Sequence, residues 1–116
     1  MADDDYDFTL VVDDTLPSIS ETLENGDGTP PDLSQPGTII NLVIRDSNHA
    51  RAEFGGQASF IGSGPDDPEV QYDWQDSDST TDGVYNFRWR VTFPNGKTKT
   101  YPNGKIPRRL LISNVV

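Results

Sequence analysis

Carboxylates are the most concentrated reactive groups in this sequence. Seven of them gather in one stretch, at Asp66, Asp67, Glu69, Asp73, Asp76, Asp78 and Asp82. Such oxygen ligands bind Ca²⁺, but their spacing is not that of a helix–loop–helix calcium site. A pair of carboxylates can also hydrolyse glycosides, yet nothing in the sequence indicates an insertion that would form a substrate cleft. We therefore interpret the stretch as a solvated acidic loop, and we predict no catalytic residue, metal or cofactor.

Few other residues offer side-chain chemistry. The chain has no cysteine, which excludes disulfides and thiolate zinc sites. The single histidine, His49, ends the run Asp46-Ser47-Asn48-His49, a composition typical of an exposed turn. Trp74 and Trp89 would be able to stack on sugars if they were exposed. Both lie on the apolar phase of an alternating segment, which favours packing in a core.

Charge is divided unevenly along the chain. Residues 1–82 contain all 19 acidic residues and only two bases, Arg45 and Arg51, whereas residues 83–116 contain seven bases and no acid. Either the basic strands are neutralised by acidic neighbours within the fold, or the surface is bipolar and suited to packing against other copies or other proteins. In the second case, the candidate assembly interface is a cationic patch of four side chains whose faces must coincide: Arg88, Arg90, Lys97 and Lys99. We predict no nucleic-acid partner, because the acidic segment would repel phosphate.

Residues 84–93 contain the clearest structural pattern. Apolar and polar side chains alternate throughout, which predicts a long strand with an aromatic inner face and a polar, cationic outer face. Aromatic rings bury large areas, so this strand is expected at the centre of the core. The predicted core anchors are Tyr85, Phe87, Trp89 and Phe93, with Trp74 from an earlier strand. Pro94-Asn95-Gly96 then predicts a tight turn into a partner strand at residues 97–101.

The rest of the chain also favours strands. Alternation predicts them at residues 6–12, 18–23, 38–45, 50–61, 70–74 and 106–116. Gly55-Gly56 indicates a bulge or a hairpin turn. Ile39 and Val43 would face outward from a central strand, so we expect a neighbouring element or a partner subunit to cover them. Gly83-Val84-Tyr85 partly matches the tyrosine corner of immunoglobulin-type sandwiches.

These strands, with turn signals between them and no amphipathic helix, predict an all-β fold. We expect an immunoglobulin-like antiparallel β-sandwich of about seven to nine strands, with a small closed β-barrel as the alternative. One domain is expected at this length, covering residues 6–116 after a flexible acidic tail at residues 1–5. No apolar run approaches the roughly 18 residues of a membrane span, and the Asp-rich start is unlike a signal peptide. We therefore predict no membrane partner.

The order of these features resembles the N-terminal domain of phage baseplate upper proteins and related modules of phage tails and virions. The resemblance spans roughly residues 16–112 and depends on the order of short motifs. These motifs are Gly28-Thr29-Pro30-Pro31-Asp32-Leu33-Ser34, the strand ending Ile44-Arg45, Val70-Gln71-Tyr72-Asp73-Trp74, Asp78 to Gly83-Val84-Tyr85, Arg90-Val91-Thr92-Phe93-Pro94-Asn95-Gly96 and Tyr101-Pro102-Asn103.

The resemblance implies a non-enzymatic, immunoglobulin-like module that serves as a structural or adaptor protein in a bacteriophage virion. Its expected partners are other virion proteins and copies of itself in a symmetric assembly. The expected localisation is the virion, after synthesis in the host cytoplasm. The position in the virion stays open between the tail or baseplate, the head–tail junction and the capsid surface. The alternative function is a carbohydrate-binding module for host adhesion, which exposure of Trp74 or Trp89 would favour.

Overall fold

The described part of the chain folds entirely as β-strands and loops. The computed structural model describes residues 6–15, 17–46, 53–102 and 108–113. Its eight strands are β1 (Phe8–Val11), β2 (Ile19–Thr22), β3 (Ile39–Asp46), β4 (Phe54–Phe60), β5 (Glu69–Tyr72), β6 (Gly83–Thr92), β7 (Thr98–Tyr101) and β8 (Arg108–Ser113). Each overlaps a segment that was predicted to be a strand, so the all-β prediction is confirmed. The predicted acidic tail at residues 1–5 and the predicted turn at His49 lie outside the described residues.

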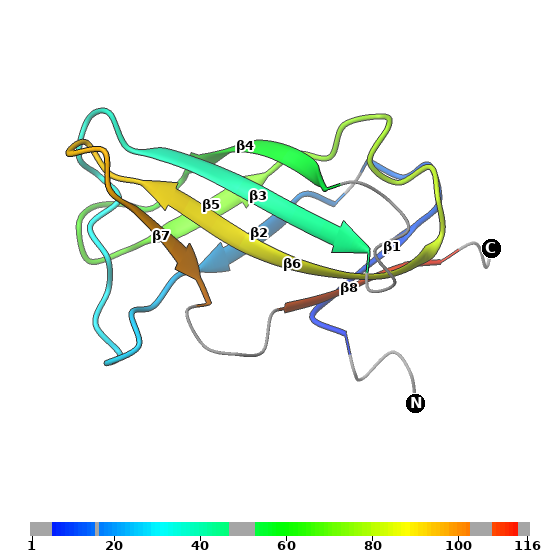
Figure 1. Ribbon diagram of the computed structural model, residues 1–116, viewed down its shortest axis with the longest axis horizontal. Coiled ribbons are helices and arrows are strands. Elements are labelled where there is room, and N and C mark those ends of the chain that lie inside the picture. Colours follow the sequence, from blue (N-terminus) through cyan, green and yellow to red (C-terminus); the bar gives the residue numbers. More distant parts are fainter. Residues whose placement is uncertain (1–5, 16, 47–52, 103–107, 114–116) are drawn as a thin grey trace.

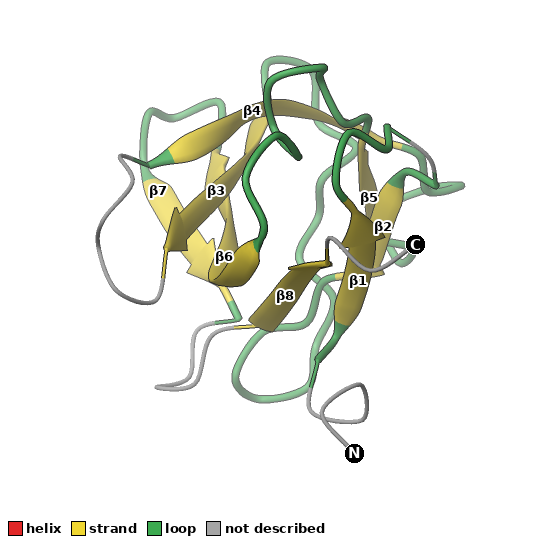
Figure 2. Ribbon diagram, turned by 90° about the vertical axis from the view of Figure 1, so that its right-hand side faces the viewer, coloured by secondary structure: helices red, strands yellow, loops and turns green. Residues whose placement is uncertain are grey.

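The strands form a single sheet that nearly closes on itself, as the small-barrel alternative predicted. They pair in the order β1-β8-β6-β3-β4-β5-β2, and β7 pairs with the end of β6 that β8 does not reach. Strand β4 pairs with β3 through residues 54–58 and with β5 through residues 59–60. It therefore passes from one layer, which contains β3 and β6, to the other layer, which contains β5 and β2. The strands consequently surround a common interior (Figure 1, Figure 2).

One pair of strands departs from the predicted antiparallel pattern. Strand β1 runs parallel to β8, with Phe8 opposite Leu110 and Leu10 opposite Ile112. A short hairpin can join only antiparallel strands, whereas these two lie at opposite ends of the described chain and meet only after the sheet has wrapped round. The sheet is therefore mixed, and the antiparallel prediction is wrong for this pair.

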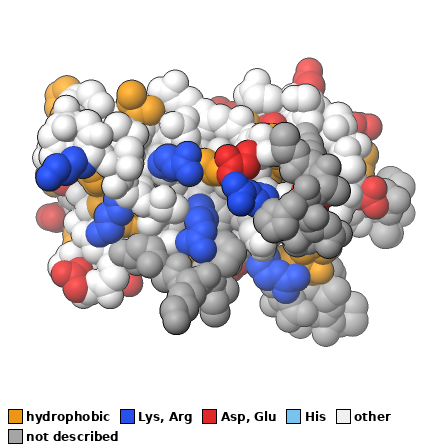
Figure 3. Space-filling view, viewed as in Figure 1, with side chains coloured by type: hydrophobic (Ala, Val, Ile, Leu, Met, Phe, Trp, Pro, Cys, Tyr) orange, Lys and Arg blue, Asp and Glu red, His pale blue; other side chains and the backbone are white. Residues whose placement is uncertain are grey.

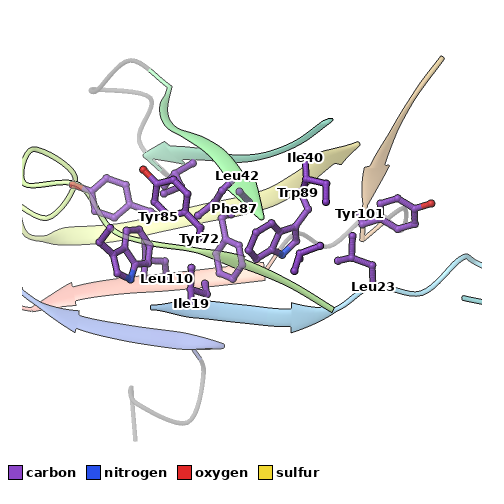
Figure 4. Packing of buried hydrophobic residues seen from close by; sticks show 14 of the residues in the cluster. Ile19, Leu23, Ile40, Leu42, Tyr72, Tyr85, Phe87, Trp89, Tyr101 and Leu110 are labelled. Carbon is purple, nitrogen blue, oxygen red and sulfur yellow. The ribbon is translucent and has the colours of Figure 1, made fainter. Parts of the chain in front are cut away.

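Trp89 occupies the middle of the core. Its side chain is 0% exposed and lies opposite Leu42 of β3 and Tyr101 of β7. Figure 4 shows Trp89 and Phe87 pointing from β6 into the space between the layers, which Ile19 of β2 enters from the other side. Large buried rings contribute much of the apolar area removed from water on folding. Packing around β6 therefore holds the two layers together.

The other predicted core anchors lie close to this centre. Tyr85 and Trp74 are buried like Phe87, and Phe93 is partly buried against the cluster just beyond the end of β6. Tyr85 also forms the tyrosine corner, because its hydroxyl donates a 2.8 Å hydrogen bond to the carbonyl of Thr81. This bond ties the β5–β6 loop to the start of β6.

Gly55 allows β3 and β4 to approach closely. The pair Gly55-Gly56 does not form a hairpin turn, since β4 runs through it in continuous register with Val43 and Leu42 of β3. Gly55 has φ +112°, and a Cβ at this position would lie 2.2 Å from the carbonyl oxygen of Leu42. A side chain cannot be accommodated there without moving the backbone.

Replacing Trp89 by alanine should destabilise the domain by about 3–5 kcal/mol, the usual cost of deleting a large buried aromatic side chain. That is a large share of the total free energy of unfolding of a domain, which is roughly 5–15 kcal/mol. The matched control is Arg90→Ala, the next residue on the outer face, which should change stability by no more than about 0.5 kcal/mol. Urea unfolding followed by circular dichroism measures both. Equal effects of the two substitutions would contradict the central position of Trp89.

Candidate interaction surface

The outer face of β6 carries the two arginines of the predicted interface. Arg88 lies opposite Val43 of β3, and Arg90 lies between Asn41 of β3 and Thr100 of β7. Both arginines line a groove of about 340 Å³ over β3, β6 and β7, together with Val43, Arg45, Glu53 and Thr100. We call this surface the arginine groove. Figure 3 shows Lys and Arg side chains gathered on this face of the molecule.

The arginine groove has an excess of positive charge. Three arginines against one glutamate among its lining residues leave a formal charge of +2. Arg45 forms an ion pair with Glu53, and Arg88 Nη1 donates a 2.7 Å hydrogen bond to the carbonyl of Pro102. Arg90 is exposed and forms no ion pair with any described acid. The groove therefore presents guanidinium groups that suit carboxylate partners.

The two lysines of the predicted interface do not line the arginine groove. Lys99 lies opposite Val91, on the same phase of β7 as the buried Tyr101, because successive residues of a strand point to opposite sides. Its Nζ donates a 3.1 Å hydrogen bond to Asn25 Oδ1 and lies 5.5 Å from the centre of the Tyr101 ring. Lys97 is exposed in the turn before β7. The condition that the four faces coincide is not met for Lys99: Thr100, rather than a lysine, lies opposite Arg90, and Thr98 lies opposite Thr92.

Two apolar side chains of β3 lie on the same outer face. Ile39 is 45% exposed, and Val43 is half-buried in the arginine groove. The sequence led us to expect cover for both residues from a neighbouring element or a partner subunit. Within the described ranges, no element covers Ile39. An apolar strand at the middle of a polar face is consistent with a protein-binding surface.

Some carboxylates of the acidic stretch between Asp66 and Asp82 accept hydrogen bonds from neighbouring residues. Asp78 is buried, and its Oδ2 accepts hydrogen bonds from the Tyr72 hydroxyl at 2.6 Å and from the Gln75 amide at 2.8 Å. Burial, and then the bond with Asp78, raise the pKa of the Tyr72 phenol. No group of three or more potential ligands close enough to hold a metal ion occurs among the residues that the structure describes.

Asp73 is likewise used locally. Its carboxylate accepts a 2.6 Å hydrogen bond from Ser18 and a 3.1 Å bond from Gln71. These donors, Ser18 first, hold the pKa of Asp73 below its ordinary value. The carboxylate thus fastens the chain before β2 to the residue that follows β5.

Four exposed carboxylates lie together at one end of the barrel. Asp76 and Asp82 lie in the β5–β6 loop, and Asp13 and Asp14 lie in the β1–β2 loop. The two loops are joined, because the Asp13 amide donates to the Ser79 carbonyl at 3.0 Å and the Ser79 hydroxyl donates to the Asp14 carbonyl at 2.7 Å. Acidic side chains appear at this end, on the right in Figure 3. We call these four residues the acidic end.

Neither tryptophan is placed to stack on a sugar. Trp74 is 4% exposed, and its indole N–H donates a 3.1 Å hydrogen bond to the carbonyl of Pro17. Trp89 is enclosed in the core. The exposure of an indole ring that would favour the carbohydrate-binding alternative is therefore absent at both positions.

An inward-facing glutamate is the feature that sequence reasoning missed. Glu21 lies on β2 between the buried Ile19 and Leu23, and its side chain is only 19% exposed. Its Oε1 accepts a 2.9 Å hydrogen bond from the indole N–H of Trp89, and its Oε2 accepts a 2.8 Å bond from Arg108 Nε. The sequence signal was an acid in phase with two apolar residues of the predicted strand at residues 18–23, Ile19 and Leu23.

This glutamate lies where strand pairing does not join the two layers. Glu21 and Arg108 line two grooves, of about 210 Å³ and about 200 Å³, beside β2. Strand β2 pairs only with β5 in the sheet, so it has no ladder to β6 or β8. The hydrogen bonds of Glu21 with Trp89 and Arg108 supply the link.

Comparisons of the chain with protein-family models, with curated proteins and with solved structures found no match. Among the described residues, no helix has the length and apolar character that crossing a membrane requires.

Glu21→Ala should destabilise the domain by about 1–3 kcal/mol, because it leaves the buried indole N–H of Trp89 without an acceptor. Glu21→Gln keeps an oxygen for that bond and removes only the charge that faces Arg108. A partly exposed ion pair of this kind contributes about 0–1 kcal/mol. The free energy of unfolding of the glutamine variant should therefore stay near that of the parent. Urea unfolding of the three proteins distinguishes the two contributions. Equal losses of stability in the alanine and glutamine variants would show that the ion pair with Arg108, and not the hydrogen bond from the indole, accounts for the stabilisation by Glu21.

Proposed function

We propose that the protein is a non-enzymatic structural component of a bacteriophage virion that works by binding other virion proteins through its outer sheet face. Two features support this proposal. The ordered resemblance to phage baseplate and tail modules covers nearly the whole sequence. The observation that carries the mode of action is the arginine groove, in which Arg88 and Arg90 border the half-buried Val43.

The composition of this face suits protein–protein contact. Interfaces are enriched in arginine and in apolar side chains at their centre, and are depleted in lysine and glutamate. Here the lysines lie elsewhere, and Ile39 and Val43 are on the central strand β3 beside Arg88 and Arg90 of β6. Arginine also binds carboxylates through two parallel hydrogen bonds, which adds orientation to affinity.

The scaffold under this face is rigid. Strand β3 is paired on both sides, with β4 and β6, and the inner side chains of β6 are locked in the core. A preorganised surface loses little conformational entropy on binding. A module of this kind is suited to holding a neighbour in a fixed position in a particle, whether in the tail or baseplate, at the head–tail junction or on the capsid surface.

The test is incorporation into particles. We expect the protein in purified virions at a fixed copy number, measured by quantitative mass spectrometry, and we expect Arg88→Glu with Arg90→Glu to leave the domain folded but to abolish its incorporation. Both side chains point away from the core, so circular dichroism and the melting temperature should stay near those of the parent.

The matched control is Lys97→Glu with Lys99→Glu, which changes the net charge by the same amount at two side chains that do not line the arginine groove. This variant should incorporate as the parent does. Absence of the parent protein from purified particles would overturn the proposed function. Normal incorporation of the arginine variant would overturn the role of the arginine groove.

A further inference from the structure

We infer that the partner of the arginine groove is the acidic end of a second copy of this chain, an inference that rests on the proposed function as a binding module. The contact joins Arg88 and Arg90 of one copy to the β1–β2 and β5–β6 loops of the next. It would make the protein a self-assembling element of the particle rather than an isolated adaptor.

Charge complementarity supports this choice of partner. The groove carries a formal charge of +2, while Asp13, Asp14, Asp76 and Asp82 are exposed at the acidic end. The ion pairs among the described residues involve only Arg45 with Glu53 and Arg108 with Asp7 and Glu21. The acidic end and Arg90 therefore have no described ion-pair partner within one molecule. The arginine groove is positively charged and the acidic end is negatively charged, so the two surfaces are complementary.

The two loops of the acidic end are also held together by hydrogen bonds rather than being independent of each other. Backbone and side-chain bonds of Ser79 join the two loops. Trp74 adds a third link by donating to the carbonyl of Pro17, and the Tyr85 hydroxyl holds Thr81. Because these bonds already order the loops, docking them costs little further entropy. Their carboxylates can approach the groove as a unit.

The positions of the two surfaces determine the type of assembly. The groove lies on the outer face of β3, β6 and β7, and the acidic end lies beyond the strands at the start of β6. The two are different surfaces, so the contact is heterologous: each copy offers a groove to one neighbour and an acidic end to another. A heterologous contact generates a ring if the rotation closes and an open chain if it does not.

Such a contact should depend strongly on salt. Exposed charges are screened beyond a Debye length of about 8 Å at physiological ionic strength and about 3 Å at 1 M salt. We expect the purified protein to associate as its concentration rises at low salt, and we expect the association constant to fall at least tenfold at high salt. Analytical ultracentrifugation of the isolated chain measures both effects.

Two neutralised variants test the pairing of the surfaces. The first, Arg88→Gln with Arg90→Gln, removes charge from the groove and keeps the acidic end. The second, Asp13→Asn and Asp14→Asn with Asp76→Asn and Asp82→Asn, neutralises the acidic end and keeps the groove. Each should be monomeric alone, whereas an equimolar mixture should form a one-to-one heterodimer and no larger species, because only one intact contact is available. The control Lys97→Gln with Lys99→Gln should associate as the parent does.

Several outcomes would overturn the inference. A parent protein that stays monomeric at low salt, or neutralised variants that associate as strongly as the parent, would exclude the contact between copies. If the parent is monomeric and Arg88→Glu with Arg90→Glu still fails to enter particles, the groove binds a different virion protein. The proposed function then stands and the inference fails. Self-association of a protein that is absent from purified particles would support the contact and overturn the function.

Discussion

The hydrogen bond from the Trp89 indole to Glu21 is the interaction on which the closed shape of this domain depends. The largest side chain of the core must be buried, and burial leaves its N–H in need of an acceptor. The acceptor comes from β2, which is otherwise held only by β5 and by its own apolar residues. Arg108 then binds the same carboxylate from β8. A single glutamate thus joins β2 to β6 and β8, two strands with which β2 forms no ladder.

The same constraint positions the candidate binding surface. Side chains alternate across a strand, so fixing Phe87 and Trp89 in the core places Arg88 and Arg90 on the outside. Pairing of β6 with β3 then brings Val43 and Arg45 beside them. The arginine groove therefore lies on the outer side of the strand whose inner side chains are at the centre of the core.

Local patterns made the strands predictable. Alternation of apolar and polar residues is a property of neighbouring residues, so together with the turn at residues 94–96, which predicted β7, it located the eight described strands and the inward phase of Trp89. The tyrosine corner was also readable, because it depends on a Tyr at the start of one strand and on backbone four residues before it. The acidic end was predictable only in part. Its acidic residues are evident in the sequence, but the hydrogen bonds by which Ser79 joins the two loops are not.

Relations between distant segments could not be read in this way. The register of β7 on β6 decides that Thr100 rather than Lys99 lies beside Arg90, and a turn of one more residue would reverse that choice. The parallel pairing of β1 with β8 and the passage of β4 between the layers depend on how the whole sheet wraps. The role of Glu21 was not readable because its partners, Trp89 and Arg108, are 68 and 87 residues away in sequence.

Paramagnetic relaxation in mixed samples tests most directly whether the arginine groove binds the acidic end of another copy. The chain has no cysteine, so Thr80→Cys places a single nitroxide label in the β5–β6 loop. The labelled protein, at natural isotope abundance, is mixed at low salt with ¹⁵N-labelled parent. We expect the amide signals of Val43, Arg88, Arg90 and Thr100 to broaden, and to recover when salt is raised. Absence of broadening, or broadening confined to residues outside the outer face of β3, β6 and β7, would contradict this mode of binding.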